Sequence, residues 1–191
     1  MSTKSCKLLL LTAFLFFTVS DVFSQSSLPD GVTLRVVIIR HGEKPPKGDN
    51  LSCQGFNRAI GLPAVLYSKF GKPDYTYVPR MKTGKSTSSV RMFQTVSPFA
   101  IKYNLTVDTR YAETDSVGVA GSVVKKTGTV LLVWEHGNMP PIARALGVQN
   151  VPGWKGSDFD SIWIIDFPAG GGTPVMTIGS EGLKPGTNCP N

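Results

Sequence analysis

The chain contains few of the residues that usually hold metals or carry redox chemistry. Its 191 residues include two histidines and three cysteines, and none of these has the spacing of a zinc site. No block of basic residues is interleaved with aromatic ones, so nucleic acid is not expected as a partner. Charged residues make up 17% of the chain and hydrophobic residues 41%, which indicates a folded globular protein. Without repeats or a shift in composition, we expect a single domain.

The N-terminal residues have the layout of a secretory signal peptide. Lys4 and Lys7 precede an apolar run over 8–19, and small residues follow up to a cleavage site expected after Ser24. The alternative is a membrane anchor, but the run is short for a span of about 20 residues. We therefore expect a secreted or periplasmic protein without a stable membrane anchor. The predicted division is a signal peptide over 1–24 and one domain over 25–191.

Charge and cysteine content bear on the partner and the compartment. Cleavage would remove two lysines and one aspartate, so the net charge of +7 would fall by one and the domain would stay basic. A basic domain favours anionic substrates. Cys53 and Cys189 would remain in an oxidising compartment, where a bridge between them and two free thiols are both open readings.

Two apolar runs end in similar polar sequences. The run 36–39 is followed by RHG, and the run 130–134 is followed by EHG. His41 and His136 in these sequences are the only histidines of the chain. Ligands of open α/β sheets bind at the carboxyl ends of the strands. If the two strands are parallel neighbours, both imidazoles reach one pocket.

Strand patterns alternate with helix patterns along the chain, which predicts an α/β fold: a three-layer α/β/α sandwich with a mostly parallel central sheet. Pro63 lies inside the first helix and is expected to kink or split it. Glycines at 170–172 are typical of a hairpin turn between the last two strands. The expected strands are 34–39, 75–78, 105–107, 129–134, 162–167 and 174–178. The expected helices are 51–70, 89–103, 117–126 and 138–147.

Four segments together point to a family. RHGEKP comes first, followed by LSCQGFNRA, STSSVRMFQTVSPFA and VLLVWEHGNMPPIARALG. In this order they resemble the histidine phosphatase superfamily, which has the phosphoglycerate mutase-like fold. The resemblance covers most of the region 34–167. It implies a phosphate-transfer site that needs neither a metal nor another cofactor.

The resemblance assigns roles to four residues. His41 would be the nucleophile, and Arg40, Arg91 and His136 would form the phosphate pocket. The chemistry fits, because a neutral imidazole can attack phosphorus and guanidinium groups suit phosphate oxygens. The competitors for the place of Arg91 are Arg80 and Lys85.

Three further residues near the two histidines are expected to support the site. Gly42 would let the backbone approach closely, and Glu43 would pair with Lys44 or Arg58. Asn138 would either contact the substrate or cap the helix that follows.

The general acid is less clearly marked. Some members of the family carry an aspartate directly after the second histidine, where this chain has Gly137. Glu113 is the best candidate, and the alternatives are Asp115, Glu135 or no carboxylate. Alternation along the strand predicts that Glu135 points away from His136.

These observations favour a phosphomonoester hydrolase that acts on a small phosphorylated substrate through a phosphohistidine. A phosphoglycerate-mutase-type phosphotransferase is the enzymatic alternative, although the interval between Arg91 and His136 is short for the insertions of mutases. The non-enzymatic alternative is a catalytically silent module that binds phosphate or anionic glycans.

Overall fold

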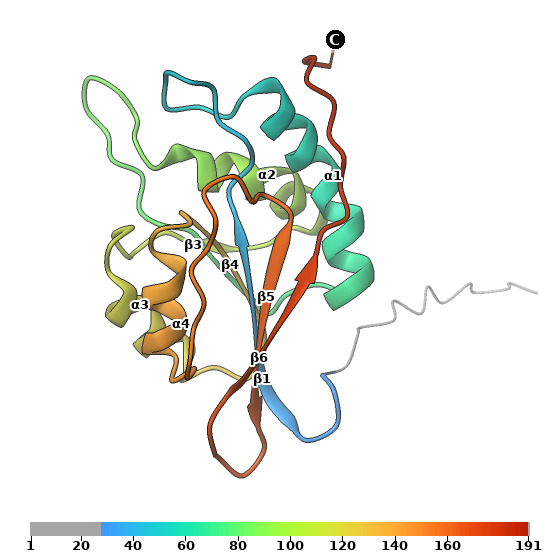
Figure 1. Ribbon diagram of the computed structural model, residues 1–191, viewed down its shortest axis with the longest axis vertical. Helices are drawn as coiled ribbons and strands as arrows, with labels where there is room; N and C mark the ends of the chain where they lie inside the picture. The colour runs from blue at the N-terminus through green and yellow to red at the C-terminus, as the bar shows by residue number, and fades with distance from the viewer. Residues whose placement is uncertain (1–27, 191) are drawn as a thin grey trace, which may run out of the picture.

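The computed structural model describes residues 28–190, which form a central sheet between two layers of helices (Figure 1). The predicted signal peptide lies outside this range. Within residues 28–190, no helix combines the length and apolarity needed to cross a membrane.

The sheet has six strands in the order β3-β2-β4-β1-β5-β6. β1, β2, β3 and β4 run parallel to one another, whereas β5 is antiparallel to both β1 and β6. This confirms the mostly parallel sheet and the hairpin at its end. The strands are β1 Val32–Arg40, β2 Tyr75–Tyr77, β3 Val107–Asp108, β4 Gly128–Trp134, β5 Ser161–Pro168 and β6 Val175–Ser180.

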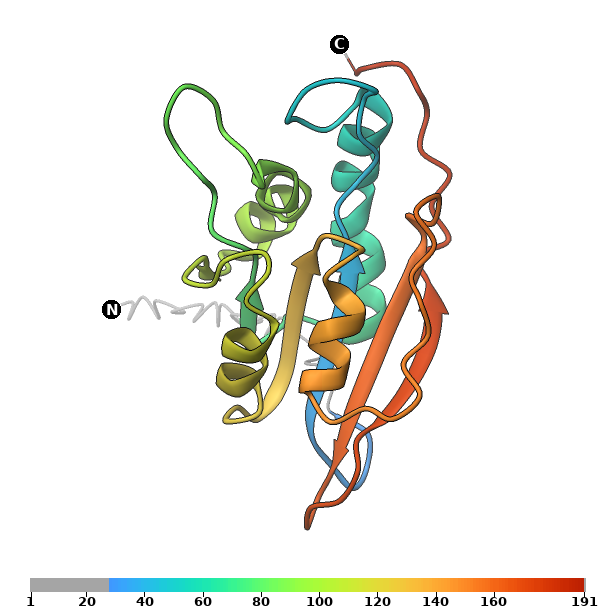
Figure 2. The same cartoon turned by 60° about the vertical axis from the view of Figure 1, so that its left-hand side comes forward.

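Two helices cover each face of the sheet (Figures 1 and 2). Val37 and Ile39 pack with the apolar side chains of α1 and α2, whereas Val36 and Ile38 pack with those of α3 and α4. This alternation confirms the predicted three-layer sandwich, because successive side chains of a strand point to opposite faces. The helices are α1 Cys53–Phe70, α2 Val90–Tyr103, α3 Ser116–Val123 and α4 Met139–Ala145.

Strands β1 and β4 are parallel neighbours in the middle of the sheet. Arg40 at the end of β1 lies opposite Trp134 at the end of β4. The backbone N–H of His41 donates to the carbonyl of Trp134 at 3.1 Å, so the pairing continues past the last strand residue. The RHG sequence and the EHG sequence therefore start side by side at one edge of the sheet.

Helix α1 is continuous, so Pro63 does not split it, which was one of the two expected effects of this residue. Its N-cap Ser52 accepts a hydrogen bond from Gly55 N, and it ends at Gly71 with a φ of 70°. Leu62 and Leu66 on either side of the proline are buried against the sheet. Tertiary packing thus holds the helix together where local propensity alone predicts an interruption.

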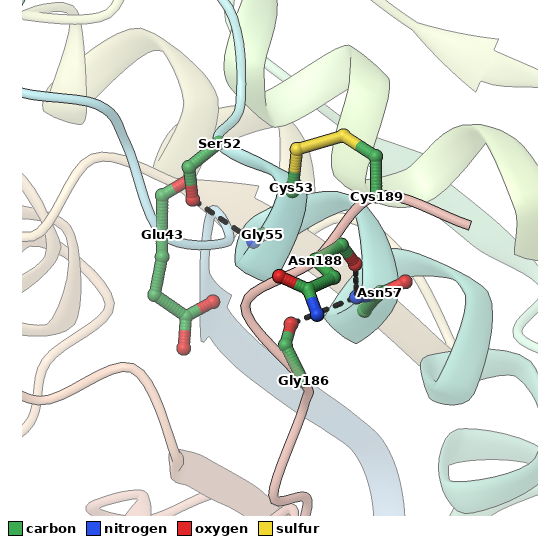
Figure 3. Close-up of a disulfide and its surroundings, with 8 residues drawn as sticks. All are labelled: Glu43, Ser52, Cys53, Gly55, Asn57, Gly186, Asn188 and Cys189. Carbon is green, nitrogen blue, oxygen red and sulfur yellow. Dashed lines mark hydrogen bonds between the residues drawn. A yellow bond between two sulfur atoms is a disulfide. The ribbon is translucent and has the colours of Figure 1, made fainter. Parts of the chain in front are cut away.

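The C-terminal tail is tied to α1 by a disulfide between Cys53 and Cys189 (Figure 3). The amide of Asn57 also donates to the carbonyls of Gly186 and Asn188, both at 2.7 Å. The bridge joins residues 136 positions apart. Bridges that close long loops typically stabilise a fold by about 2–5 kcal/mol. The structure thus shows a bridge between the two cysteines and not two free thiols.

Candidate active site

His41 lies directly after β1, with its ring buried and its orientation held by the neighbouring backbone. The side chain is 1% exposed, and Nδ1 lies 2.7 Å from the carbonyl oxygen of Gly42. A carbonyl can only accept, so Nδ1 carries the proton and the lone pair lies on Nε2. Nε2 is therefore available as a nucleophile.

The surroundings of His41 also keep it neutral. Burial, together with the positive charges of Arg40 and Arg91, lowers its pKa to about 3 although the bond to Gly42 works in the other direction. His136 contributes further to the lowering. At neutral pH the imidazole is uncharged and lies beside cationic groups, as direct attack on an anionic phosphate requires.

Arg40 is held rigidly beside this imidazole. Its Nη1 donates to the carbonyls of Gly156 at 2.7 Å and Asp158 at 3.0 Å, and its guanidinium carbon lies 3.8 Å from the centroid of the Phe159 ring. Burial lowers its pKa, while neighbouring carboxylates oppose that effect. Its Nε is buried without a hydrogen-bond partner among the described residues, and a buried donor of this kind favours an anionic acceptor.

Arg91 comes from the first turn of α2 and lies near both Arg40 and His41. Its Nη1 faces the carbonyls of Gly48 and Asp49 at 3.3 Å, and its Nε is likewise buried with no partner in the described part of the chain. Its charge acts on both Arg40 and His41. The two competitors are placed differently: Arg80 donates to the carbonyl of Arg110, and Lys85 is exposed.

His136 lies two residues past β4, beside a carboxylate. Glu135 Oε1 contacts its Nδ1 without the alignment of a hydrogen bond. Burial and the charge of Arg40 lower the pKa of His136. A Cβ added to Gly156 would lie 3.6 Å from Nε2 of His136, so the residue whose carbonyl holds Arg40 lies near this ring.

The prediction that Glu135 points away from His136 is wrong. β4 ends at Trp134, and the alternation of a strand does not extend into the turn that follows. In that turn the Glu135 carboxylate also accepts from Gly137 N at 2.7 Å and from Asn138 Nδ2 at 3.3 Å. Asn138 occupies the N-cap position of α4, but its side chain makes no cap bond. It supports Glu135 instead.

Gly42 is required where the loop after His41 crosses α1. A Cβ on Gly42 would lie 2.8 Å from the carbonyl oxygen of Gly55, too close for any other residue. The backbone N–H of Gly42 donates to Thr95 Oγ1 of α2 at 2.9 Å. Sequence reasoning did not find Thr95, because only the fold brings it to this loop.

The next residue, Glu43, anchors the loop through an ion pair with Arg58, one of its two predicted partners. Arg58 donates to both carboxylate oxygens of Glu43 at 2.7–3.2 Å, and its Nη1 donates to Glu181 at 2.5 Å. Although burial opposes its charge, the two carboxylates raise the pKa of Arg58. The backbone of Ser52 also donates to the Glu43 carbonyl at 2.9 Å.

The candidate acids lie in different places. Glu113 accepts from Ser89 Oγ at 2.5 Å, and its carbonyl accepts from the Trp134 indole at 2.8 Å, so it joins the start of α2 to the end of β4. Asp115 caps α3 by accepting from Gly118 N at 2.9 Å. Within residues 28–190, no group of three or more His, Cys, Asp or Glu side chains is arranged to hold a metal ion.

Neither the available family models nor the curated proteins match the sequence. Solved structures resemble it in fold. The protein histidine phosphatase SixA complexed with tungstate aligns with a TM-score of 0.54 and 15% identity, over 77% of this chain and 97% of its own. A mycobacterial glucosyl-3-phosphoglycerate phosphatase with inorganic phosphate aligns with a TM-score of 0.50 and 16% identity, over 69% and 88%. The chain thus has the phosphoglycerate mutase-like fold that its sequence predicts.

We expect the stability of the wild type to fall more steeply below about pH 6.5 than that of His41→Asn. The unfolded imidazole takes up a proton near that pH, whereas the folded one stays neutral down to about 3. Protonation of His41 therefore stabilises the unfolded state but not the folded one. As the pH falls, the free energy of unfolding decreases on this account by up to about 1.4 kcal/mol per pH unit. Urea unfolding of both proteins at pH 7 and pH 5 measures the difference. An identical pH dependence in both would contradict it.

Proposed function

We propose that this protein is a phosphomonoester hydrolase that works through a phosphohistidine on His41. The supporting observation is the convergence of a neutral imidazole, whose lone pair lies on Nε2, with the guanidinium groups of Arg40 and Arg91, whose buried Nε atoms lack partners among the described residues. Two solved structures with this fold are named as phosphatases, which agrees with hydrolysis.

In the proposed reaction, Arg40, Arg91 and His136 hold the phosphoryl oxygens while His41 Nε2 attacks phosphorus. The bond between phosphorus and the ester oxygen breaks, and the departing alkoxide takes a proton from Glu113. Water then attacks the phosphohistidine, gives a proton back to Glu113 and releases phosphate with the restored imidazole. Positioning and charge neutralisation account for most of the rate in such transfers.

Glu135 fits a positioning role in this scheme. It contacts Nδ1 of His136, which leaves Nε2 of that ring for the phosphoryl group. A bound phosphate dianion favours the protonated ring, and the nearby carboxylate supports the same state. The carboxylate of Glu113 instead contacts Ser89, the N-cap of α2, which stands two residues before Arg91.

We expect the domain from Gln25 to hydrolyse p-nitrophenyl phosphate in EDTA, and His41→Ala to abolish turnover because no nucleophile remains. Arg91→Gln should lower kcat/KM by about 10²–10³-fold through lost charge stabilisation. Steady-state assays and trapping of an acid-labile phosphoenzyme measure both effects.

The matched control is Arg80→Gln, which should stay near wild type because Arg80 binds the carbonyl of Arg110. Turnover that survives in His41→Ala would overturn the proposal. Phosphate binding without any turnover would favour the silent binding module, and phosphate transfer to a second alcohol would favour the mutase.

For Glu113→Gln we predict a loss that depends on the leaving group. The kcat/KM for ethyl phosphate should fall by about 10²–10⁴-fold, because the ethoxide needs a proton. The kcat/KM for p-nitrophenyl phosphate reports only the steps up to release of p-nitrophenolate, which leaves without a proton, so it should stay near wild type even though the later attack of water is slowed. Asp115→Asn, whose side chain can still cap α3, is the control. Glu135→Gln should slow both esters equally; a loss confined to ethyl phosphate in that variant would move the acid role to Glu135.

We also propose that the protein is exported and processed near Gln25. The Cys53–Cys189 bridge supports this, since disulfides persist in oxidising compartments. N-terminal sequencing of protein recovered outside the cytoplasm should begin at or near Gln25, and an intact N-terminus there would contradict cleavage.

A further inference from the structure

A second pocket, of about 620 Å³, adjoins the candidate active site. It begins at Glu43 and Lys44, which directly follow the loop that bears His41, and the N-terminus of α1 lies on its other side. Lys44 is close enough to His136 for its charge to lower the pKa of that ring. The main residues that line the pocket are Lys44, Pro45, Pro46, Leu51, Phe159 and Thr187.

Phe159 connects this pocket with the phosphate site. Its ring packs against the guanidinium of Arg40 and lies edge-on to His41, with 6.1 Å between the two ring centroids, and it also lines the second pocket. A phosphoryl group placed between Arg40 and His41 would therefore have this aromatic ring beside it.

The ring sits on a braced loop. The Asp158 carboxylate accepts from the backbone N–H groups of Asp160 and Ser161, and from Ser161 Oγ at 2.6 Å. The Asp158 carbonyl accepts from both Arg40 and Trp154. Bonds on both sides of Phe159 hold its backbone, so the ring acts as a fixed wall.

The lining has an apolar part with little free charge, to which Ser52, Gln54 and Thr187 add polar side chains. Phe159, Leu51 and the two proline rings present carbon surface, and Glu43 is already neutralised by Arg58. Lys44 is exposed at the rim. Such a surface stabilises a flat carbon ring by excluding water from both partners, and it offers no free carboxylate to a cationic group.

The outer wall of the pocket is the C-terminal tail. Thr187 lines the pocket, and its neighbours are held to α1 by the Cys53–Cys189 bridge and by the two bonds from Asn57 (Figure 3). The pocket therefore depends on a segment that is distant in sequence from the candidate catalytic residues and joined covalently beside them.

We infer that this pocket receives the alcohol part of the substrate and selects phosphomonoesters whose alcohol carries a flat apolar ring. The inference rests on the proposed hydrolase function. It names Phe159 and Leu51 as specificity residues and the disulfide-held tail as the element that completes the pocket.

The test compares benzyl phosphate with ethyl phosphate, two esters of primary alcohols that differ by the ring. The wild type should favour benzyl phosphate in kcat/KM by about tenfold or more, as apolar pockets discriminate to this extent. In Phe159→Ala and in Leu51→Ala the ratio should fall below about threefold. Phe56→Ala is the matched control, because Phe56 lines a neighbouring groove and not this pocket.

A second part of the test concerns the C-terminal tail. Reducing the wild type, or replacing both Cys53 and Cys189 by Ser, should lower the benzyl-to-ethyl ratio while ethyl phosphate is still hydrolysed. Circular dichroism of each protein confirms that the domain remains folded under the assay conditions.

The outcomes separate the inference from the function on which it rests. Hydrolysis of both esters with a ratio that Phe159→Ala and Leu51→Ala leave unchanged would overturn the inference alone. Hydrolysis of neither ester by the wild type would overturn the proposed function and the inference with it.

Discussion

The parallel pairing of β1 with β4 is the constraint on which the candidate site depends. With Arg40 opposite Trp134, the residues that follow each strand leave the sheet at the same edge. Both strands are buried on both faces, so a slip by one residue would exchange the side chains packed against the two helical layers. The packing of the core thereby sets the position of His41 and His136.

A second set of contacts, around the loop after β1, determines where the His41 ring carries its proton. The carbonyl of Gly42 determines which nitrogen of His41 is protonated, and the Gly42 backbone is itself held by Thr95 and by close packing on Gly55. Glu43 continues the restraint through Arg58. These contacts come from α1 and α2, so the helices on one face of the sheet set the chemical state of a residue at its edge.

The concentration of positive charge around His41 has a structural basis. Arg40 is almost fully buried, and it is kept there by carbonyl oxygens and by the face of an aromatic ring, which compensate the cation without neutralising its charge. A carboxylate partner would offset the field that an incoming phosphate needs. The carboxylates of the site are instead occupied with His136, Ser89 or Arg58.

The sequence by itself determined the order of strands and helices, the two histidines at strand ends, and Arg91 at the start of a helix. All of these follow from local periodicity and from residues adjacent in the chain, reinforced by the family resemblance. The tertiary structure decided the partners that come from afar: Thr95 on Gly42, Phe159 on Arg40 and Cys189 on Cys53. It also reversed two local expectations. Glu135 turns toward His136 because the strand has already ended, and α1 runs through Pro63 because packing on the sheet outweighs one lost hydrogen bond.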